Sequence, residues 1–275
     1  MDLIKKRMKG MGLTNSTIKT YSSILEKFFE HNGKVNSFTE EEINNYLNYL
    51  IIVKNYSPRS RNLVMKIIRY YCREFLGQEF NLKKAKENKP IPKICEDEEF
   101  NQIISVTPNI KHRLCLCLMR YSGLRRYEVI RVMKHHIQLD GRLLVKEGKG
   151  RKDRYTILPP QVLEDLKKFI DLLPVDNPYV FQGRNTKHYN VRTPQAILIN
   201  AFKKLKWNKE RWFGCHALRH AFCVWALDNR IGDYDEVSKM LGHSVRQTTQ
   251  IYTQCRRLNL LSSINKCKEI EVVVR

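Results

Sequence analysis

The hydrophobic positions in the first third of the chain recur with the period of an α-helix. The first apolar stripe, within residues 14–31, consists of Ile18, Tyr21, Ile24, Leu25, Phe28 and Phe29. Thr39 and Glu42 have the spacing of a capping box ahead of a second stripe. Ser57 and Pro58 are a typical N-cap and first helical residue for a third helix, which should end near Gly77. The pattern therefore predicts three helices between residues 14 and 77.

A break in this pattern separates two domains. Residues 83–93 have no apolar period and contain two prolines, which is typical of an interdomain linker. We therefore expect a helical domain at residues 1–82 and a second domain at 94–275. In the second domain, the pattern predicts helices at 97–106, 110–121, 125–134, 160–172, 192–206, 215–230, 234–241 and 245–253. Residues 142–146 and 154–158 flank a Gly-Lys-Gly turn and predict a short β-hairpin, so the fold should be mainly α with a small sheet.

The charge of the chain indicates a polyanionic partner. Its net charge is +22, from 50 basic and 28 acidic residues. Residues 1–90 hold 17 of the basic and 9 of the acidic residues, which leaves 33 and 19 for the remainder, so both parts are basic. The third predicted helix carries a charged face made of Arg59, Arg61, Lys66, Arg69 and Arg73. Such a face is often only solvated, but basic surfaces on two bodies also suit nucleic acid.

The remaining composition indicates a folded protein with reduced thiols. No apolar run approaches the length of a membrane span, and no apolar signal region follows the N-terminal lysines, so we expect a cytoplasmic protein without a membrane partner. The eight cysteines form no Cys-x-x-Cys pair, and several lie in apolar stretches. We expect them to be free and mostly buried.

Six polar residues in the second domain together could open a phosphodiester without a metal. They are Arg125, Lys149, His216, Arg219, His243 and Tyr252. Two arginines can hold and neutralise a phosphate, and a lysine and two histidines can donate hydrogen bonds or move protons. A tyrosine hydroxyl can attack phosphorus and hold a covalent intermediate. We therefore expect a catalytic site that needs no cofactor.

The short sequences around these residues resemble the catalytic motifs of tyrosine recombinases, the phage-integrase and Xer family. They are Ser-Gly-Leu-Arg-Arg-Tyr-Glu (122–128), Glu-Gly-Lys-Gly-Arg-Lys-Asp-Arg (147–154), His-Ala-Leu-Arg-His (216–220), Leu-Gly-His-Ser (241–244) and Thr-Thr-Gln-Ile-Tyr-Thr (248–253). The resemblance is strong over residues 112–256 and rests on helix pattern alone over 14–80. One departure is Arg126, since the family more often has an apolar residue there.

The resemblance implies a fold and a set of roles. The first domain would be a small helical, SAM-like core-binding domain, and the second an α-rich catalytic domain with a C-terminal exchange tail. Arg125 and Arg219 would clamp the scissile phosphate, with Glu128 orienting Arg125, and Lys149 would protonate the leaving 5′-oxygen. His216 and His243 would hydrogen-bond the phosphate, and Tyr252 would be the nucleophile. The neighbouring Lys146, Arg151, Lys152 and Arg154 would be phosphate contacts or simply solvated.

The implied activity is site-specific DNA recombination. Tyr252 would form a 3′-phosphotyrosyl link, and two rounds of exchange would pass through a Holliday junction without ATP or metal. The partners would be double-stranded DNA with specific sites and further copies of the chain, four in the synaptic complex. Two rivals stay open: a type IB topoisomerase-like relaxing enzyme and a DNA-binding regulator without catalysis.

A zinc site is the rival interpretation of the His-x-x-Arg-His motif. His216 and His220 are spaced to share a helix face, and Cys215 and Cys223 lie nearby in sequence. The paired ligands of a structural zinc site are missing, however, and these four side chains would not all point the same way. We therefore expect no metal and regard His220 as a supporting or core residue.

Overall fold

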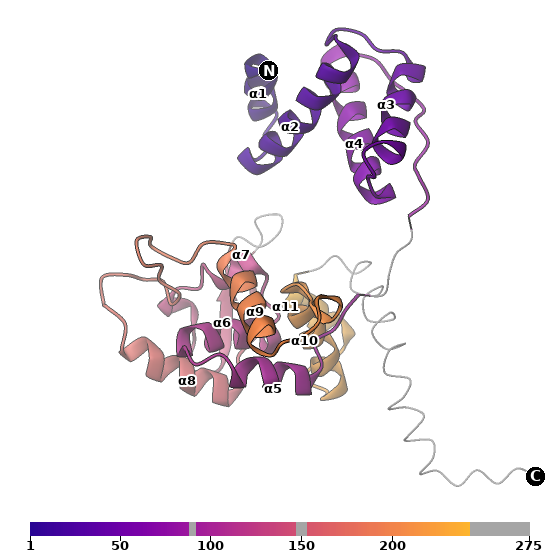
Figure 1. The fold of residues 1–275 in the computed structure, drawn as a ribbon. Coiled ribbons are helices and arrows are strands. Elements are labelled where there is room, and N and C mark those ends of the chain that lie inside the picture. The colour runs from indigo at the N-terminus through magenta and orange to yellow at the C-terminus, as the bar shows by residue number, and fades with distance from the viewer. Residues whose placement is uncertain (88–91, 147–152, 243–275) are drawn as a thin grey trace, which may run out of the picture. The chain divides into compact units, whose positions relative to one another are not determined.

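The computed structural model divides the chain into two compact units, residues 1–90 and 91–275 (Figure 1). It describes residues 1–87, 92–146 and 153–242. In this part of the chain no helix is both long and apolar enough to cross a bilayer.

The first unit is a set of helices around one core. Its elements are α1 (Asp2–Gly10), α2 (Asn15–Asn32), α3 (Glu40–Ile52), α4 (Pro58–Tyr71) and a π-helical turn, η1 (Cys72–Leu76). The three expected helices are α2, α3 and α4, whereas α1 was not predicted. The capping box of Thr39 and Glu42 is formed, and η1 ends at Gly77 with a φ of 66°. Phe28, which is fully buried, packs against Phe38 and Tyr46 in the core.

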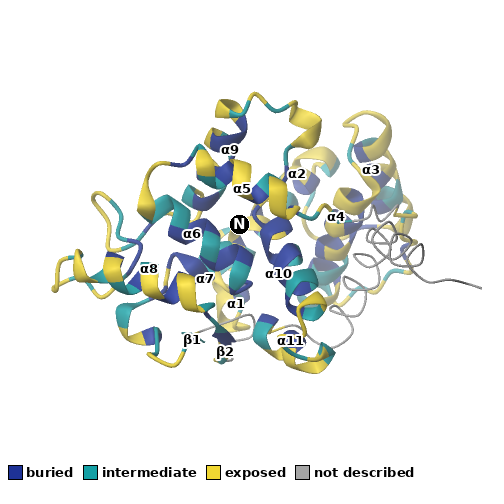
Figure 2. Cartoon of the chain, turned by 90° about the horizontal axis from the view of Figure 1, so that it is seen from below, coloured by how far each residue is buried: buried dark blue, intermediate teal, exposed yellow. Residues whose placement is uncertain are grey.

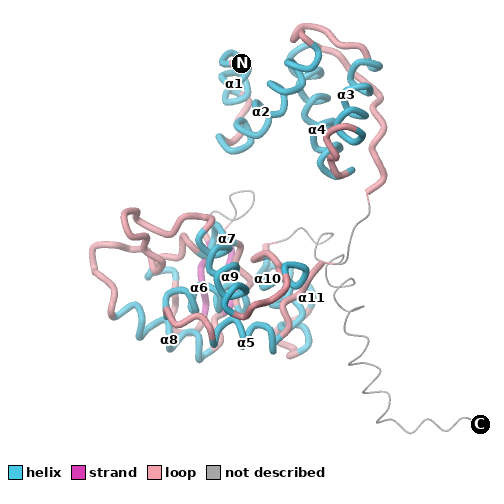
Figure 3. The backbone as a smooth tube through the Cα atoms, viewed as in Figure 1, coloured by secondary structure: helices cyan, strands magenta, loops and turns pink. Residues whose placement is uncertain are grey.

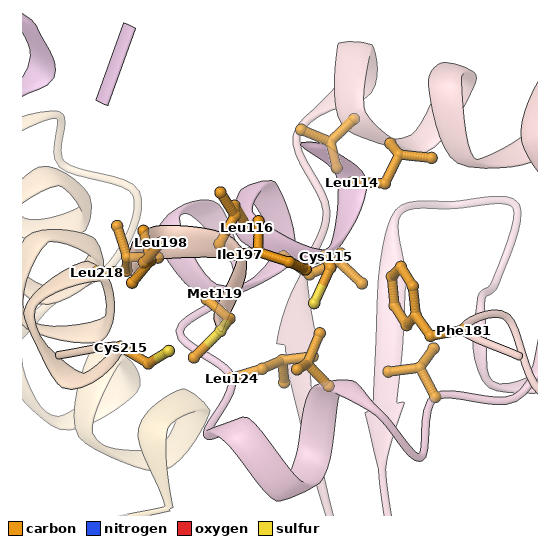
Figure 4. Close-up of a cluster of buried hydrophobic side chains, with 14 of the residues drawn as sticks. Leu114, Cys115, Leu116, Met119, Leu124, Phe181, Ile197, Leu198, Cys215 and Leu218 are labelled. Atoms are coloured by element: carbon orange, nitrogen blue, oxygen red, sulfur yellow. The ribbon is translucent and has the colours of Figure 1, made fainter. Parts of the chain in front are cut away.

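The second unit is built around a largely buried helix, α6. Its helices are α5 (Asp97–Ser105), α6 (Ile110–Tyr121), α7 (Arg126–Val129), α8 (Pro160–Asp171), α9 (Thr193–Lys204), α10 (His216–Asp228) and α11 (Tyr234–Leu241), with short 3₁₀ turns η2 (Lys134–His136) and η3 (Lys209–Arg211). Helix α6 packs against α7, α8, α9 and α10. Figure 4 shows Leu116 and Met119 beside Leu198 and Leu218 in this core. The surrounding helices bury one face and expose the other (Figure 2).

The expected hairpin is present as a two-stranded antiparallel sheet (Figure 3). Strand β1 (Arg142–Val145) pairs with β2 (Arg154–Ile157) so that Val145 lies opposite Arg154. Lys149, which lies between these strands in the sequence, is outside the described residues. The side chains of Arg154 and Thr156 are on the same face of β2, because residues two apart in a strand point the same way. The Thr156 hydroxyl donates to the carbonyl oxygen of Ser122 (2.9 Å), which ties the hairpin to the end of α6.

The helix predicted at 125–134 is wrong beyond its first turn. Helix α7 ends at Val129, and the chain then pairs with an extended segment. The N–H of Lys134 donates to Pro178 (2.8 Å), and the N–H of Val180 donates to Val132 (2.9 Å). These long-range bonds replace the helical ones, so tertiary pairing overrides the local apolar period. The helix expected at 245–253 is outside the described residues.

None of the six cysteines in the described part of the chain belongs to a disulfide. Cys72, Cys95, Cys115, Cys215 and Cys223 are buried, and Cys117 is half-buried. Burial raises the pKa of the Cys72 thiol to about 11, which keeps it protonated at neutral pH. The expectation that the cysteines are mostly buried is therefore confirmed for these six; Cys255 and Cys267 are not described.

Candidate active site

The structure describes three of the six predicted catalytic residues: Arg125, His216 and Arg219. The other three, Lys149, His243 and Tyr252, lie outside the described residues, so their roles stay predictions. The three described residues come from the loop after α6 and from α10, and α10 packs directly on α6.

Arg125 is held by the carboxylate of Glu128. It is the N-cap of α7, and its backbone N–H donates to Glu128 Oε2 (2.8 Å). Its Nη1 donates to Glu128 Oε1 (2.8 Å). The expectation that Glu128 orients Arg125 is therefore confirmed.

Arg219 is close to Glu128 and is almost completely buried. Its two Nη atoms donate to the carbonyl oxygens of Gly123 and Leu241, and Nη1 is 3.8 Å from Glu128 Oε2. Burial and the positive charge of Arg125 lower the pKa of Arg219 to about 9, so the guanidinium is still charged at neutral pH. Arg219 is therefore fixed by the protein before any substrate arrives.

A third arginine, Arg154, completes the cluster and was not predicted to belong to it. Its Nη1 and Nη2 donate to the two oxygens of Glu128 (2.9 and 2.8 Å), a bidentate pair. Its side chain is 9% exposed, so the expectation that Arg154 is simply solvated is wrong, and its contact with a phosphate stays a prediction. The alternation of side chains along β2 could have predicted this burial, because it puts Arg154 on the same face of the strand as buried Thr156.

Glu128 is the common partner of the three arginines, here called the arginine cluster (Arg125, Arg154 and Arg219). The Glu128 side chain has no exposed surface. Burial alone would raise its pKa, but the hydrogen bonds and charge of Arg154, the Arg125 N–H and the charge of Arg219 lower it to about 2. Three guanidinium charges against one carboxylate leave a local charge of +2. The cluster is therefore held together internally and still attracts an anion.

The C-terminal end of α11 supplies three consecutive carbonyl groups to the arginine cluster. Arg154 Nε donates to the carbonyl of Met240 (2.7 Å), Arg219 to that of Leu241, and Arg125 Nη2 to that of Gly242 (3.3 Å). The last carbonyls of a helix have no partner within the helix and carry partial negative charge, so cationic donors suit them. The end of α11 is thus bound to all three arginines.

Two glycines permit this close packing. Gly123 has a φ of 66°, and a Cβ there would lie 2.5 Å from Phe222 Cδ1 and 2.8 Å from Leu241 Cδ2. Gly242 follows α11 with a φ of 60°, so this helix ends where the one predicted at 234–241 does, and a Cβ there would lie 2.8 Å from Arg154 Cδ. Both positions need glycine for their backbone angles and for space.

His216 begins α10 and is neutral at physiological pH. Partial burial, followed by the charges of Arg219, Arg126 and Arg125, lowers its pKa below 6.5. Burial and His216 lower the pKa of His220 to about 4, and the two rings are 6.4 Å apart between centroids. A neutral imidazole can accept a proton or a hydrogen bond. Among the described residues, no three His, Cys, Asp or Glu side chains are grouped as metal ligands, which gives the zinc interpretation no support there.

Both units match family models. Residues 93–257 match the phage integrase family, and residues 1–82 match the phage integrase N-terminal SAM-like domain. Tyrosine recombinase XerA of Pyrococcus horikoshii is 30% identical, with 96% of this chain and 91% of that protein covered.

Solved structures give the same result. A crystal structure of XerA recombinase matches with 25% identity and a TM-score of 0.53, covering 94% of this chain and 96% of that one. A lambda integrase tetramer bound to a Holliday junction shares the fold, with 19% identity and a TM-score of 0.70, covering 88% of this chain and 76% of that one. The two matched domains and the identity along nearly the whole chain show that this protein belongs to the phage integrase family.

Proposed function

We propose that this protein is a tyrosine site-specific recombinase that cuts and rejoins double-stranded DNA. The observation that carries the proposal is the arginine cluster, a preorganised, cationic site. Two of its members, Arg125 and Arg219, stand at the positions of the catalytic motifs that would clamp the phosphate. The relatives and solved structures that match over most of the chain are tyrosine recombinases. They do not favour a topoisomerase-like enzyme or a regulator without catalysis.

The arginine cluster fits the electrostatic demand of phosphoryl transfer. Negative charge accumulates on the non-bridging oxygens as phosphorus becomes five-coordinate, and fixed cations stabilise that charge without having to reorganise. Glu128 and the α11 carbonyls hold Arg125 and Arg219 in place before DNA binds. Part of the Arg125 side chain remains exposed, 12% of its surface, so it can reach a phosphate oxygen.

In the reaction we propose, the Tyr252 hydroxyl oxygen attacks the scissile phosphorus and the 5′-oxygen leaves. His216 takes the tyrosine proton, which its lowered pKa permits because the imidazole is neutral. Lys149 gives a proton to the leaving 5′-oxygen. Rejoining is the reverse: the 5′-hydroxyl of a partner strand attacks the 3′-phosphotyrosyl link and releases Tyr252. The bond count is conserved, so no ATP is consumed.

The positions of Lys149 and His243 in the sequence support their assignment. Lys149 lies between the paired residues Val145 and Arg154, and Arg154 belongs to the arginine cluster. His243 follows Gly242, whose carbonyl accepts from Arg125. Lys149 therefore precedes a member of the cluster by five residues, and His243 directly follows a residue bound to the cluster. We propose that both act on the same phosphate.

The assembly we propose is a tetramer of this chain on two DNA sites, joined by the C-terminal tail. The tail after Tyr252 contains Leu258, Leu260, Leu261 and Ile264, an apolar stripe that a neighbouring subunit could bury. The fold match to a lambda integrase tetramer on a Holliday junction supports this arrangement. A fold back onto its own domain is the alternative for the tail.

The deciding experiment traps the covalent intermediate on a nicked suicide substrate. Wild-type protein should give a slow-migrating, protease-sensitive DNA band, and Tyr252→Phe should give none while binding the same DNA nearly normally. A band from Tyr252→Phe would assign the nucleophile to another residue. Exchange between two labelled duplexes then separates a recombinase from a relaxing enzyme, which acts on a single duplex.

A further inference from the structure

Residues 82–87, most of which the sequence assigns to the interdomain linker, are bound to α4 by two arginine side chains and one asparagine. Arg69 Nη2 donates to the Leu82 carbonyl (2.7 Å), and Arg61 Nη1 donates to the Lys83 carbonyl (2.6 Å). Arg61, expected on the charged face of its helix, is only 6% exposed, and burial lowers its pKa. Two arginines thus fix the beginning of this segment.

Asn62 fixes the rest of the segment. Its Nδ2 donates to the Ala85 carbonyl (2.9 Å) and to Glu87 Oε1 (2.8 Å), and its Oδ1 accepts from the Ala85 N–H (2.9 Å). The amide thereby pairs with both backbone groups of Ala85, as a neighbouring strand would. Asn62 is 9% exposed and Ala85 is half-buried, so the two bonds between them are partly sheltered from water. Residues 82–87 are therefore a fixed edge of the first unit, here called the clamped segment.

The clamped segment and α4 together line a groove of about 590 Å³. Its cationic residues are Arg59, Lys66, Arg69, Arg73 and Lys84, and its one carboxylate, Glu87, already accepts from Asn62. Tyr21, Leu63 and Tyr70 add apolar surface, and Leu63 is 47% exposed. Cations around an apolar floor match a sugar–phosphate backbone, in which anionic phosphates alternate with apolar deoxyribose faces.

The length of the cationic row favours an extended polyanion over a small anion. Arg59, Lys66 and Arg73 are seven residues apart on one side of the helical stretch, so the row covers roughly 21 Å at 1.5 Å per residue. One phosphate could engage only part of such a row. Lys84 is the one cation lining the groove that the clamped segment contributes.

We propose that the clamped segment is a built part of the DNA-binding surface of the first unit. In this proposal, Asn62 is a positioning residue that holds Lys84 against a DNA backbone phosphate across the groove from α4. The choice of DNA as the occupant rests on the proposed function. The contact is to phosphate, so it raises affinity for every sequence alike.

The test measures how salt weakens binding of the full-length chain to a short duplex of arbitrary sequence. Each phosphate contact contributes about 0.9 to the slope of log affinity against log salt concentration. Lys84→Gln should therefore make the slope shallower by about one, and Asn62→Asp should do the same with Lys84 still present. Adding Lys84→Gln to Asn62→Asp should change nothing further. Lys86→Gln is the matched control, because Lys86 belongs to the same segment but does not line the groove.

A rescue variant and an amide probe separate positioning from general damage. Asn62→Asp keeps an oxygen that can accept from the Ala85 N–H, but it loses the donor to the Ala85 carbonyl and to Glu87, and its charge repels Glu87, so the segment should be released. Glu87→Gln removes this repulsion and supplies a donor to the new carboxylate, so it should restore the slope. Hydrogen exchange of the Ala85 amide should accelerate in Asn62→Asp and slow again in the double variant, without DNA present. All variants should still unfold in a cooperative transition, which shows that the salt slopes compare folded proteins.

The proposal would be overturned if Lys84→Gln left the salt slope unchanged. It would also be overturned if Lys84→Gln reduced the slope by the same amount in wild type and in Asn62→Asp. A slow-exchanging Ala85 amide in Asn62→Asp would overturn it as well. These outcomes are independent of the covalent-adduct assay. A wild-type chain that binds through the groove but forms no adduct would defeat the recombinase assignment and leave the clamped segment in place.

Discussion

Replacing Glu128 by glutamine should strongly destabilise the second unit. The substitution keeps the shape of the side chain, but it removes the one negative charge among three buried or half-buried guanidinium groups and turns an acceptor toward Arg154 into a donor. Breaking a buried ion pair by removing one partner typically costs about 3–5 kcal/mol. The pKa of Glu128 gives a similar magnitude. Its fall from 4.5 to about 2 corresponds to about 3 kcal/mol, because a tenfold change in proton affinity is worth roughly 1.4 kcal/mol.

The pH dependence has a defined sign. A carboxylate with a lowered pKa in the folded state contributes its full stability above about pH 4.5, and that contribution is lost as the pH falls toward 2. The difference in unfolding free energy between wild type and Glu128→Gln should therefore be largest at neutral pH and shrink between pH 4.5 and 2. In wild type alone, this site makes stability rise with pH across the same interval.

Tryptophan fluorescence is a suitable assay, because Trp207, Trp212 and Trp225 are the three tryptophans of the chain and all belong to the second unit. In a unit of about 185 residues, a loss of 3 kcal/mol should lower the Tm by roughly 6–12 °C. Asp140→Asn removes an exposed carboxylate paired with Arg142 and should leave the Tm nearly unchanged. If Glu128→Gln unfolds like wild type at neutral pH, the arginine cluster does not depend on Glu128 and the reasoning fails.

Three further predictions concern activity. Arg125→Ala should lower the cleavage rate by roughly a hundredfold or more at saturating protein, the scale seen when a transition-state donor is removed. Arg131→Ala removes an equal charge at an exposed position and should leave the cleavage rate nearly unchanged. Equal losses of rate in the two variants would count against the phosphate clamp. Cleavage by wild type should persist in a chelator; loss in EDTA that zinc restores would revive the metal interpretation of His216 and His220. Truncation after Gln254 should leave DNA binding largely intact but sharply reduce recombination between two sites, whereas wild-type exchange by the truncated chain would show that subunits communicate elsewhere.

Local signals in the sequence were sufficient for most helices. The capping box of Thr39 and Glu42 and the proline at the start of α4 act within a few residues, so they are legible without the fold. The stretch after Val129 was not predictable in this way. Its backbone bonds go to residues 178–180, and no short-range pattern specifies a partner almost fifty residues away.

The candidate site was predictable by motif but not in its supporting contacts. Arg125 and its link to Glu128 follow from a spacing of three residues at a helix start. Arg154 and the α11 carbonyls contact Glu128 and Arg125 only once the chain has folded, because they lie far from these residues in the sequence. The same holds for Asn62, which reads as an ordinary polar helix residue and whose partners lie 23 and 25 residues further along the chain.

The three bonds from the arginine cluster to the end of α11 have a consequence for how a subunit is switched. His243 and Tyr252 follow Gly242 in the sequence, so a displacement of the segment that contains them would move the carbonyls of residues 240–242 together. Packed elements of this kind change between discrete arrangements and do not deform gradually. A population of subunits should then be a mixture of fully competent and fully silent molecules. The cleavage rate measured on the whole population would then be proportional to the fraction of competent subunits. A variant with half the wild-type rate would have half as many competent subunits, each cleaving at the wild-type rate.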